Sequence, residues 1–565
     1  MSKRSLIFVA LFLCAFLSAP FSFASVLSNK DVNIYKQIFA AHQKGQYQKA
    51  KNLETRLKNK TLTGYILFDK YFSPRYKTSA LEINNFLKKY KHLPIASDVY
   101  ALGKKKNFKI SGNPPKDPVY GGAANACSFV KRDEPINLIA RQKFSYLSNN
   151  QKKEAKDLSK KFKSLIEKTK LTQALVLLED KKTKALFNQT DIDIVLSAIA
   201  FSFFLEGNDK KALTLSERAI AGSGDNLPLA HWTAGLASWR LGKYIDSARF
   251  FETAATHDAG YPLLKSSAAF WAARAYLKEG EFDKVGDLLE LAAEQPRTFY
   301  GLLALYMTGD NLENILDEEA YPHMSPLPKF SHPALNRFYA LRQVGKQQLA
   351  DKELAALYLS LDESKQKALI ALARQKNFHK ELTNLAGVSS DTKERYPLPA
   401  WKPLNNWKLK KELVFAFVRQ ESCFNKHARS CVGARGLMQI MPQTGRVIAK
   451  MSQIPFNLHK MENEAYNLAL GQNYLTYLMG LPAVDGNLIF TAVAYNAGPG
   501  NLIKWKSKMN YQNDPLLFIE SIPAKETRGF VERIMVNYWI YNSITKSSLD
   551  TLDAVVHGKW PIYQD

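Results

Sequence analysis

The chain has 565 residues, more than one hydrophobic core usually organises, so we expect at least two domains. Its hydrophobic content of 46% and charged content of 23% are ordinary for a globular protein and exclude an intrinsically disordered chain. The net charge of +26 favours polyanionic partners, and the four cysteines show no zinc-ligand spacing.

The N-terminus has the composition of a secretory leader. Two basic residues, Lys3 and Arg4, precede an apolar run over 6–17, and a small-x-small cleavage site ends at Ala24. We therefore predict a cleaved signal peptide over 1–24 and a periplasmic mature protein with no later membrane span. An uncleaved anchor is the alternative, because the apolar run approaches spanning length.

The next 350 or so residues have the pattern of paired helices, since apolar residues recur there at spacings of three and four. Three similar turns contain Gly207, Gly242 and Gly280, which are 35 and 38 residues apart. A glycine at such a position supplies the positive φ that ends a helix. This period predicts a solenoid similar to tetratricopeptide stacking, with aromatic residues such as Trp239 and Trp271 in its core.

Prolines mark the main domain boundary. The run over 396–399, Tyr-Pro-Leu-Pro, excludes a helix and forms a stiff connector. We therefore predict a superhelical domain over 25–387, with a linker portion from about residue 310, a proline-rich connector over 388–403 and a second domain over 404–565.

A glutamate occupies an unusual position near the start of the second domain. Leu413, Phe417 and Glu421 are four residues apart, so they share one face of a predicted helix. Burial at the end of an apolar stripe disfavours the charged carboxylate and raises its pKa above the usual value of about 4.3. A proton donor at near-neutral pH needs this property, although a half-exposed glutamate that merely ends a helix would also fit this segment.

Later segments add candidate binding residues. A loop over 432–442 contains two glycines and Gln439, whose amide offers a donor and an acceptor to sugar hydroxyls and acetamido groups. Tyr495 and Asn496 precede a Gly-Pro-Gly stop and would lie at the end of a helix, where the wall of a cleft could be. The segment 520–530 leads into a last amphipathic helix.

Four motifs in this region resemble those of the soluble lytic murein transglycosylases. They are ES, GLMQIMP, AYNAGPGN and ESIPAKETRGF, in this order within about 110 residues. The resemblance implies a mainly all-α fold, in which an α-superhelical solenoid of paired helices precedes a lysozyme-like, α-rich catalytic domain.

The same resemblance implies a role for individual residues. Glu421 matches the single catalytic glutamate. The residues expected to bind substrate are Ser430, Gly436, Gln439, Met441, Tyr495, Asn496 and Glu526. Phe530 departs from the tyrosine that is frequent in the family, and neither Cys423 nor Cys431 belongs to the pattern.

The implied reaction cleaves the β-1,4 bond between N-acetylmuramic acid and N-acetylglucosamine without water and leaves a 1,6-anhydromuramyl end. Glu421 would act first as general acid and then as base, with no metal and no cofactor. The implied partners are peptidoglycan glycan strands, with other cell-wall enzymes as candidates for binding to the solenoid. We expect a monomer.

Two alternatives stay open. Glu462, Glu464 and Asp485 are candidates for the second carboxylate that a hydrolytic muramidase of lysozyme-like fold would need. A non-catalytic scaffold is the other alternative, because helical repeats bind proteins. A nucleic-acid partner is disfavoured, since the positive charge is spread along the chain without a recognition motif.

Two cysteines follow the glutamate closely. Cys423 and Cys431 are eight residues apart and could form a disulfide that braces the loop after Glu421, in an oxidising compartment. Two buried thiols are the alternative, and Cys127 has no obvious partner.

Overall fold

The computed structural model describes residues 26–73, 75–115, 133–257, 262–310, 312, 332–375, 378 and 395–565. The predicted signal peptide over 1–24 and Cys127 lie outside these residues, as does part of the predicted connector. The chain divides into two compact units. One contains Met1–Gly121 and Met324–Leu372, and the other contains Gly122–His323 and Ala373–Asp565.

Helices form almost all of the regular structure, as the sequence predicts. Within the described residues, β-structure is limited to isolated bridges such as that between Arg429 and Arg435. The helices of the first unit are α1 (Asn29–Gln43), α2 (Tyr47–Glu54), α3 (Thr63–Tyr71), α4 (Ala80–Tyr90), α5 (Ala96–Lys105), α17 (Pro333–Gln343), α18 (Gln347–Ser360) and α19 (Glu363–Gln375), the last of which runs past the boundary between the units.

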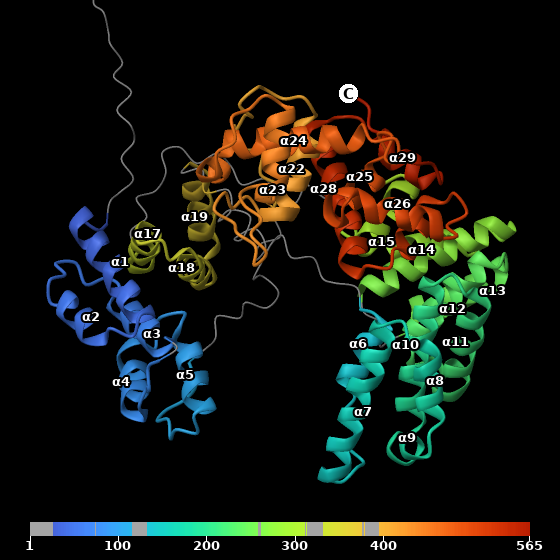
Figure 1. The fold of residues 1–565 in the computed structure, drawn as a ribbon, viewed down its shortest axis with the longest axis horizontal. Coiled ribbons are helices and arrows are strands. Elements are labelled where there is room, and N and C mark those ends of the chain that lie inside the picture. Colours follow the sequence, from blue (N-terminus) through green and yellow to red (C-terminus); the bar gives the residue numbers. More distant parts are fainter. Residues whose placement is uncertain are drawn as a thin grey trace, which may run out of the picture. The chain divides into compact units, whose positions relative to one another are not determined.

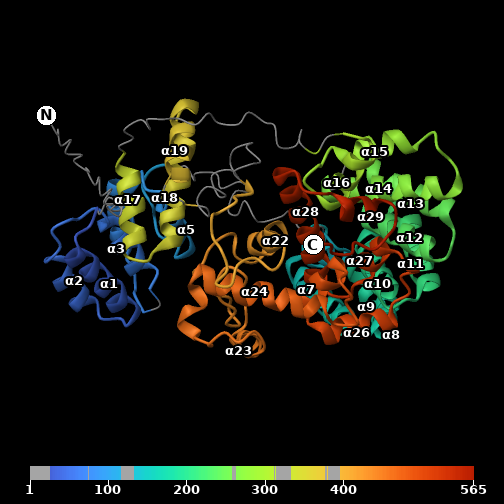
Figure 2. The same cartoon turned by 90° about the horizontal axis from the view of Figure 1, so that it is seen from above.

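In the first unit, α17 and α18 lie beside helices that precede them by more than 200 residues (Figures 1 and 2). The Tyr65 hydroxyl on α3 donates to the Glu353 carboxylate on α18 at 2.5 Å. Lys346 Nζ lies 2.6 Å from Asp69 Oδ1. These partly and fully buried polar contacts join the two sequence segments into one unit.

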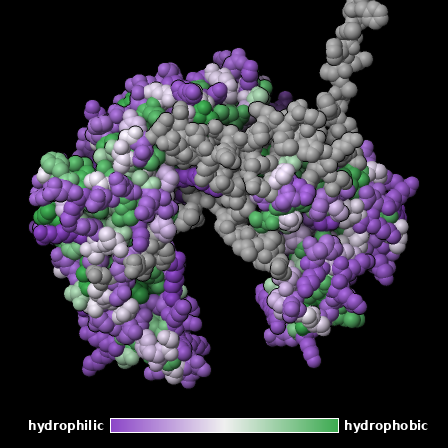
Figure 3. All heavy atoms as spheres, turned by 180° about the vertical axis from the view of Figure 1, so that it is seen from behind, coloured by the Kyte–Doolittle hydropathy of each residue, from purple (hydrophilic) through white to green (hydrophobic). Residues whose placement is uncertain are grey.

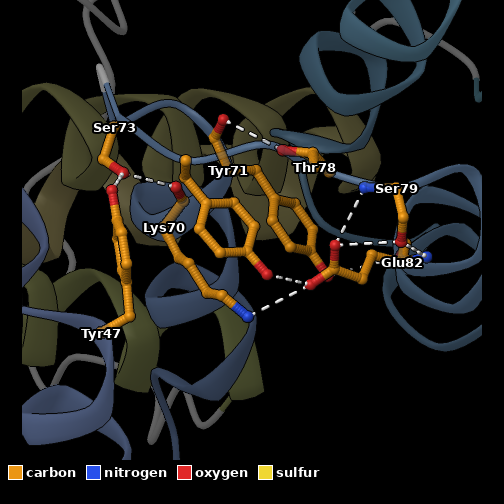
Figure 4. A network of polar contacts seen from close by, with 8 residues as sticks. Tyr47, Lys70, Tyr71, Ser73, Thr78, Ser79 and Glu82 are labelled. Atoms are coloured by element: carbon orange, nitrogen blue, oxygen red, sulfur yellow. Dashed lines mark hydrogen bonds and ion pairs between the residues drawn. The ribbon is translucent and has the colours of Figure 1, made fainter. Parts of the chain in front are cut away.

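The connection between α3 and α4 is held by a polar network (Figure 4). Glu82 accepts from the backbone N–H of Ser79 at 3.0 Å and from Lys70 Nζ at 3.2 Å, and it completes a capping box with the Ser79 side chain. The hydroxyls of Tyr47 and Ser73 lie 2.9 Å apart and continue the network to α2. The polar groups of this network form hydrogen bonds with one another, so we infer that the network stabilises this unit.

The second unit begins with the middle part of the predicted solenoid. Its helices here are α6 (Pro135–Arg141), α7 (Asn149–Glu167), α8 (Leu171–Glu179), α9 (Lys181–Leu186), α10 (Gln189–Leu205), α11 (Asp209–Ser223), η1 (Gly224–Asn226), α12 (Pro228–Arg240), α13 (Tyr244–Thr256), α14 (Pro262–Glu279), α15 (Val285–Ala293) and α16 (Phe299–Met307).

Glycine turns separate these helices as predicted. Gly207, Gly242 and Gly280 have φ angles of 80°, 73° and 80°, in the left-handed region that favours glycine. Trp239 and Trp271 lie in the core, with ring centroids 5.0 Å apart. Successive helices from α10 to α15 therefore pack in series through a shared aromatic core.

The same unit contains the region of the four motifs. Its helices here are α22 (Lys411–Ser422), α23 (Pro442–Met451), η3 (Leu458–Glu462), α24 (Glu464–Met479), α25 (Leu488–Ala497), α26 (Pro499–Lys508), α27 (Pro515–Ser521), α28 (Lys525–Thr545) and α29 (Asp550–Val556). The long helix α28 packs against both α22 and α25.

Contacts within the second unit join its two parts. The Tyr300 hydroxyl on α16 donates to the buried Glu520 carboxylate on α27 at 2.6 Å. The ring of Phe299 stacks on Trp539 of α28 with centroids 5.6 Å apart. The boundaries predicted at 24, 387 and 403 stay predictions.

No helix in the described ranges combines the length and the apolar character needed to cross a bilayer. The coloured part of the face drawn in Figure 3 is mainly hydrophilic, with small hydrophobic areas between the hydrophilic ones.

Candidate active site

Glu421 lies in the last turn of α22, as its spacing predicts. Leu413 and Phe417, on the same face, are fully buried, whereas Glu421 is only half-buried. The helix ends at once, because Cys423 adopts a left-handed conformation with φ 48° and ψ 47°. The carboxyl group therefore lies where the apolar core meets the surface.

The pKa of Glu421 is raised to about 8, mainly by burial. The negative charge of Glu526 contributes to this rise, and the Arg533 guanidinium opposes it. At neutral pH, Glu421 is therefore mostly protonated, as a proton donor must be.

Tyr495 lies beside this helix, at the end of α25. Its ring packs against Phe417 with centroids 4.8 Å apart, and its hydroxyl donates to the backbone carbonyl of Met438 at 2.7 Å. Burial, together with the charge of Glu421, raises the pKa of Tyr495 well above its usual value. Tyr495 is thus a neutral group that joins the helix of the catalytic candidate to the glycine-rich loop.

Ser430 and Gly436 shape that loop. The Ser430 Oγ accepts from the backbone N–H of Ala434 at 2.9 Å and closes an exposed turn. Gly436 has a φ of 76°, and a Cβ there would lie 2.3 Å from the backbone oxygen of Met461 and 2.3 Å from the Asn467 amide nitrogen. Glycine is required at this position by both its conformation and its close approach to a neighbouring backbone.

The amide of Gln439 is partly engaged within the protein. Its Nε2 donates to the backbone oxygens of Ala428 at 3.0 Å and Gly436 at 2.9 Å. Among the residues that the structure describes, Oε1 accepts no hydrogen bond, so the acceptor expected from the sequence is available and the donor is used within the loop. Met441, two residues later, has 39% of its surface exposed.

Asn496 and Glu526 come from different helices. The Thr527 hydroxyl on α28 donates to Asn496 Oδ1 at 2.7 Å, which connects the end of α25 to the first turn of α28. Glu526 is exposed in that turn, and its charge acts on Glu421. Helix α28 lies against both α22 and α25 (Figure 1). The charges of Glu526 and Glu421 act on Glu421 and Tyr495 respectively, so these three side chains from α28, α22 and α25 lie near one another.

The sequence analysis missed two residues of this region. Asn467, buried in α24, accepts from the Met438 N–H at 2.8 Å and donates to the Met461 oxygen at 2.7 Å, so its side chain anchors the glycine-rich loop to α24. The sequence did contain a signal for this role, because Asn467 is a polar residue within the apolar run Tyr466–Leu470. Arg533 donates from Nε to the Gln420 Oε1 at 2.8 Å, and its charge acts on Glu421.

The candidate second carboxylates have other contacts. Glu462 lies 3.1 Å from His427 Nδ1 and 2.6 Å from Arg429 Nε, and Glu464 lies 2.6 Å from Lys426 Nζ. Partial burial raises the pKa of Glu462, but hydrogen bonds from His427 and Arg429 hold it below its usual value. These two carboxylates therefore fix the loop that follows α22.

Asp485, the third candidate for a second carboxylate, also has another environment. It lies in a turn with a φ of 49°, and its charge acts on Lys506. In the part of the chain that the structure describes, the carboxylate whose charge acts on Glu421 is Glu526.

The predicted disulfide between Cys423 and Cys431 is wrong. Cys431 is a free, exposed thiol in the turn closed by Ser430 and Ala434. Cys423 is disulfide-bonded, but not to Cys431. Over the described ranges, no group of three or more His, Cys, Asp or Glu side chains is placed to hold a metal ion.

Comparison with protein families matches residues 400–518 to the transglycosylase SLT domain. The chain is 30% identical over 280 residues to the soluble lytic murein transglycosylase of Escherichia coli (strain K12), which covers 48% of this chain and 43% of that relative. It is 31% identical over 281 residues to the protein of the same name from Salmonella typhimurium, with the same shares. The matches thus span less than half the length of these curated relatives.

Solved structures are similar over most of the chain. The 70 kDa soluble lytic transglycosylase of Escherichia coli has a TM-score of 0.61 at 19% identity, and the match covers 92% of this chain and 97% of that one. An inactive glutamate-to-glutamine mutant of a lytic transglycosylase from Pseudomonas aeruginosa has a TM-score of 0.63 at 19% identity, with coverage of 94% and 99%. At this identity the likeness shows the fold, and the expected helical superhelix with a lysozyme-like domain is confirmed.

Proposed function

Because residues 400–518 match the transglycosylase SLT domain, we propose that the chain is a lytic transglycosylase that cleaves peptidoglycan glycan strands. The observation that carries the proposal is the half-buried carboxyl of Glu421, whose pKa burial raises to about 8. Such a group holds a proton at neutral pH and still lies at the surface, where a strand can reach it.

In the first half of the reaction, Glu421 gives its proton to the glycosidic oxygen between N-acetylmuramic acid and N-acetylglucosamine. The bond from this oxygen to C1 of the muramyl residue breaks, and the bonding electrons stay with the oxygen. The acetamido carbonyl of the muramyl residue stabilises the positive charge at C1 from within the substrate.

In the second half, the Glu421 carboxylate takes the proton of the muramyl C6 hydroxyl. The oxygen of this hydroxyl bonds to C1 and closes the 1,6-anhydro ring. Glu421 ends in its starting protonation state, and no water is consumed. One positioned acid/base group typically contributes about 10² to 10⁴ to the rate.

One finding favours this reaction over hydrolysis. Glu462 and Glu464, which could have activated a water, are engaged with cations of the loop after α22. The similar structure from Pseudomonas aeruginosa is an inactive mutant in which one glutamate is replaced by glutamine. Both reactions need a glutamate as general acid, so this finding supports an essential glutamate and not one reaction over the other.

The substrate contacts are part of the proposal. Ser430 and Gly436 shape the loop, and Gln439 offers Oε1 to a sugar hydroxyl or acetamido N–H. Met441 would offer its exposed apolar surface to a sugar ring, and Asn496 and Glu526 would contact the strand from α25 and α28. A related enzyme, the 70 kDa soluble lytic transglycosylase, has been solved in complex with bulgecin A.

We further propose that the protein acts in the periplasm as a monomer, exported by the leader over 1–24. Its net charge of +26 suits the acidic stem peptides of the wall. Binding of other cell-wall enzymes to the helical solenoid remains part of this proposal.

The test is release of soluble fragments from purified sacculi by the wild type, Glu421→Gln and Asp485→Asn. We expect wild-type release from Asp485→Asn, because asparagine also tolerates the left-handed conformation at 485. Glu421→Gln should fold and bind sacculi but release no fragments. Release by Glu421→Gln at the wild-type rate would end the proposal.

A further inference from the structure

Arg533 is a cation next to the catalytic candidate that none of the four motifs contains. It lies on α28, seven residues after Glu526, so the two share a helix face. Its Nε donates to Gln420 Oε1 at 2.8 Å, and Gln420 directly precedes Glu421 on α22. The guanidinium is thus tied to the turn that presents the catalytic carboxyl.

Gly529 makes room for this guanidinium. It lies one turn before Arg533 on α28, and a Cβ at Gly529 would lie 2.6 Å from Arg533 Nη1. Side chains on helices lean toward the N-terminus, and Arg533 does so over the bare backbone of the glycine. The cation therefore extends toward the turn that contains Glu526.

The packing of α22 on α28 fixes this geometry. Arg419 Nη1 donates to Asn537 Oδ1 at 3.0 Å, and Asn537 Nδ2 donates to the Ala416 backbone oxygen at 3.3 Å. Both contacts are buried. The separation of Arg533 from Glu421 is therefore set by two packed helices.

The charges around Glu421 have opposite effects. From α28, Glu526 opposes ionisation of Glu421 and Arg533 favours it, while Tyr495 on α25 is neutral. Burial lowers the pKa of Arg533, and the charges of Glu532, Glu526 and Glu421 raise it. Arginine keeps its charge over the working pH range of an enzyme.

We propose that Arg533 is a positioning residue that stabilises the negative charge developing on Glu421 as this side chain gives its proton to the glycosidic oxygen. Gly529 is the position that leaves room for the Arg533 guanidinium. The inference rests on the proposed function. In the step concerned, the O–H bond of Glu421 breaks, the proton passes to the glycosidic oxygen, and Arg533 exchanges no atom.

Arg533→Met tests the inference through its pH profile. We expect kcat to fall about tenfold with KM within about twofold, because the lost interaction is stronger in the transition state than in the ground state. The alkaline limb of the profile should move to higher pH, because Glu421 would hold its proton more tightly. Arg533→Lys keeps the charge and should return the limb toward the wild-type position.

Gly529→Ala tests the position of the guanidinium without changing Arg533 itself. Alanine is a better helix former than glycine, so the helix should be at least as stable. Its methyl group would displace the Arg533 guanidinium, and we expect the alkaline limb to move in the same direction as in Arg533→Met. Arg446→Met, which removes an exposed arginine from α23, is the matched control and should leave the profile unchanged.

The profiles are measured on soluble peptidoglycan fragments of defined length, with thermal melting of every variant. An unmoved alkaline limb in folded Arg533→Met and Gly529→Ala would overturn the inference. This outcome is distinct from failure of the proposed function, which would be seen as fragment release by Glu421→Gln.

Discussion

The hydroxyl of Tyr495 donates to the backbone carbonyl of Met438 at 2.7 Å and so connects α25 to the glycine-rich loop. Met438 itself is fully buried, and its N–H is held by Asn467 at 2.8 Å. The backbone N–H and C=O of Met438 are therefore both hydrogen-bonded, which fixes the loop directly next to Gln439. The rigidity of this loop is what the proposed reaction requires for positioning of the sugar.

Tyr495→Phe should reduce activity and stability together. The phenyl ring keeps its packing on Phe417, but the Met438 carbonyl loses its donor, at a cost of about 1–3 kcal/mol. Chemical unfolding and fragment release measure both effects. Tyr474→Phe is the control, because the Tyr474 hydroxyl makes no hydrogen bond to a described residue; an equal loss in this variant would contradict the role of the Met438 contact.

Gly436→Ala should be far more damaging than Gly433→Ala. Both glycines have positive φ, 76° and 95°, so each substitution carries backbone strain of about 1–2 kcal/mol. Only the Cβ at 436 also meets the Met461 oxygen and the Asn467 amide, at 2.3 Å, whereas that at 433 meets no atom within 4 Å. Equal unfolding free energies for the two variants would show that the loop adapts to a side chain at 436.

The stability of the protein should fall relative to Glu421→Gln as pH rises. The pKa of Glu421 is raised from 4.5 to about 8 on folding, so between these values the folded state holds a proton that the unfolded state has lost. The two proteins should be equally stable below pH 4.5. By pH 8 the variant should be more stable by roughly 1–3 kcal/mol, after allowance for solvent screening of a half-buried group. Parallel stability curves from pH 4 to 8 would contradict the raised pKa.

Thiol labelling should distinguish the two cysteines after α22. Without reductant, a maleimide should modify Cys431 and leave Cys423 unmodified. Cys431→Ser should change the unfolding free energy little, whereas Cys423→Ser should lower it by about 2–4 kcal/mol through loss of a disulfide. Modification of Cys423 in the folded, unreduced protein would contradict this assignment.

The sequence was sufficient for features that depend on local spacing. The period of four residues placed Leu413, Phe417 and Glu421 on one face, and glycines at Gly207 and Gly242 marked helix ends, because both follow from helix geometry alone. Gln439 was harder. Its φ of 43° turns the amide nitrogen to backbone oxygens of its own loop, and no sequence pattern shows this.

Contacts between distant segments could not be predicted from the sequence. The eight-residue spacing of Cys423 and Cys431 says nothing of which way either side chain faces, so their pairing could not be judged. The contact of Arg533 with Gln420 depends on how α28 lies against α22. The packing of α18 against α3 and α5 likewise joins residues nearly 300 positions apart, such as Tyr65 and Glu353.

In the proposed reaction, Glu421 is the acid and then the base, and the C6 hydroxyl of the muramyl sugar is the nucleophile. The most direct measurement is mass spectrometry of the fragments that the enzyme releases from purified sacculi in water enriched in ¹⁸O. We predict 1,6-anhydromuramyl ends without ¹⁸O. Reducing ends that carry one ¹⁸O atom would show that water is the nucleophile and that the enzyme is a hydrolase.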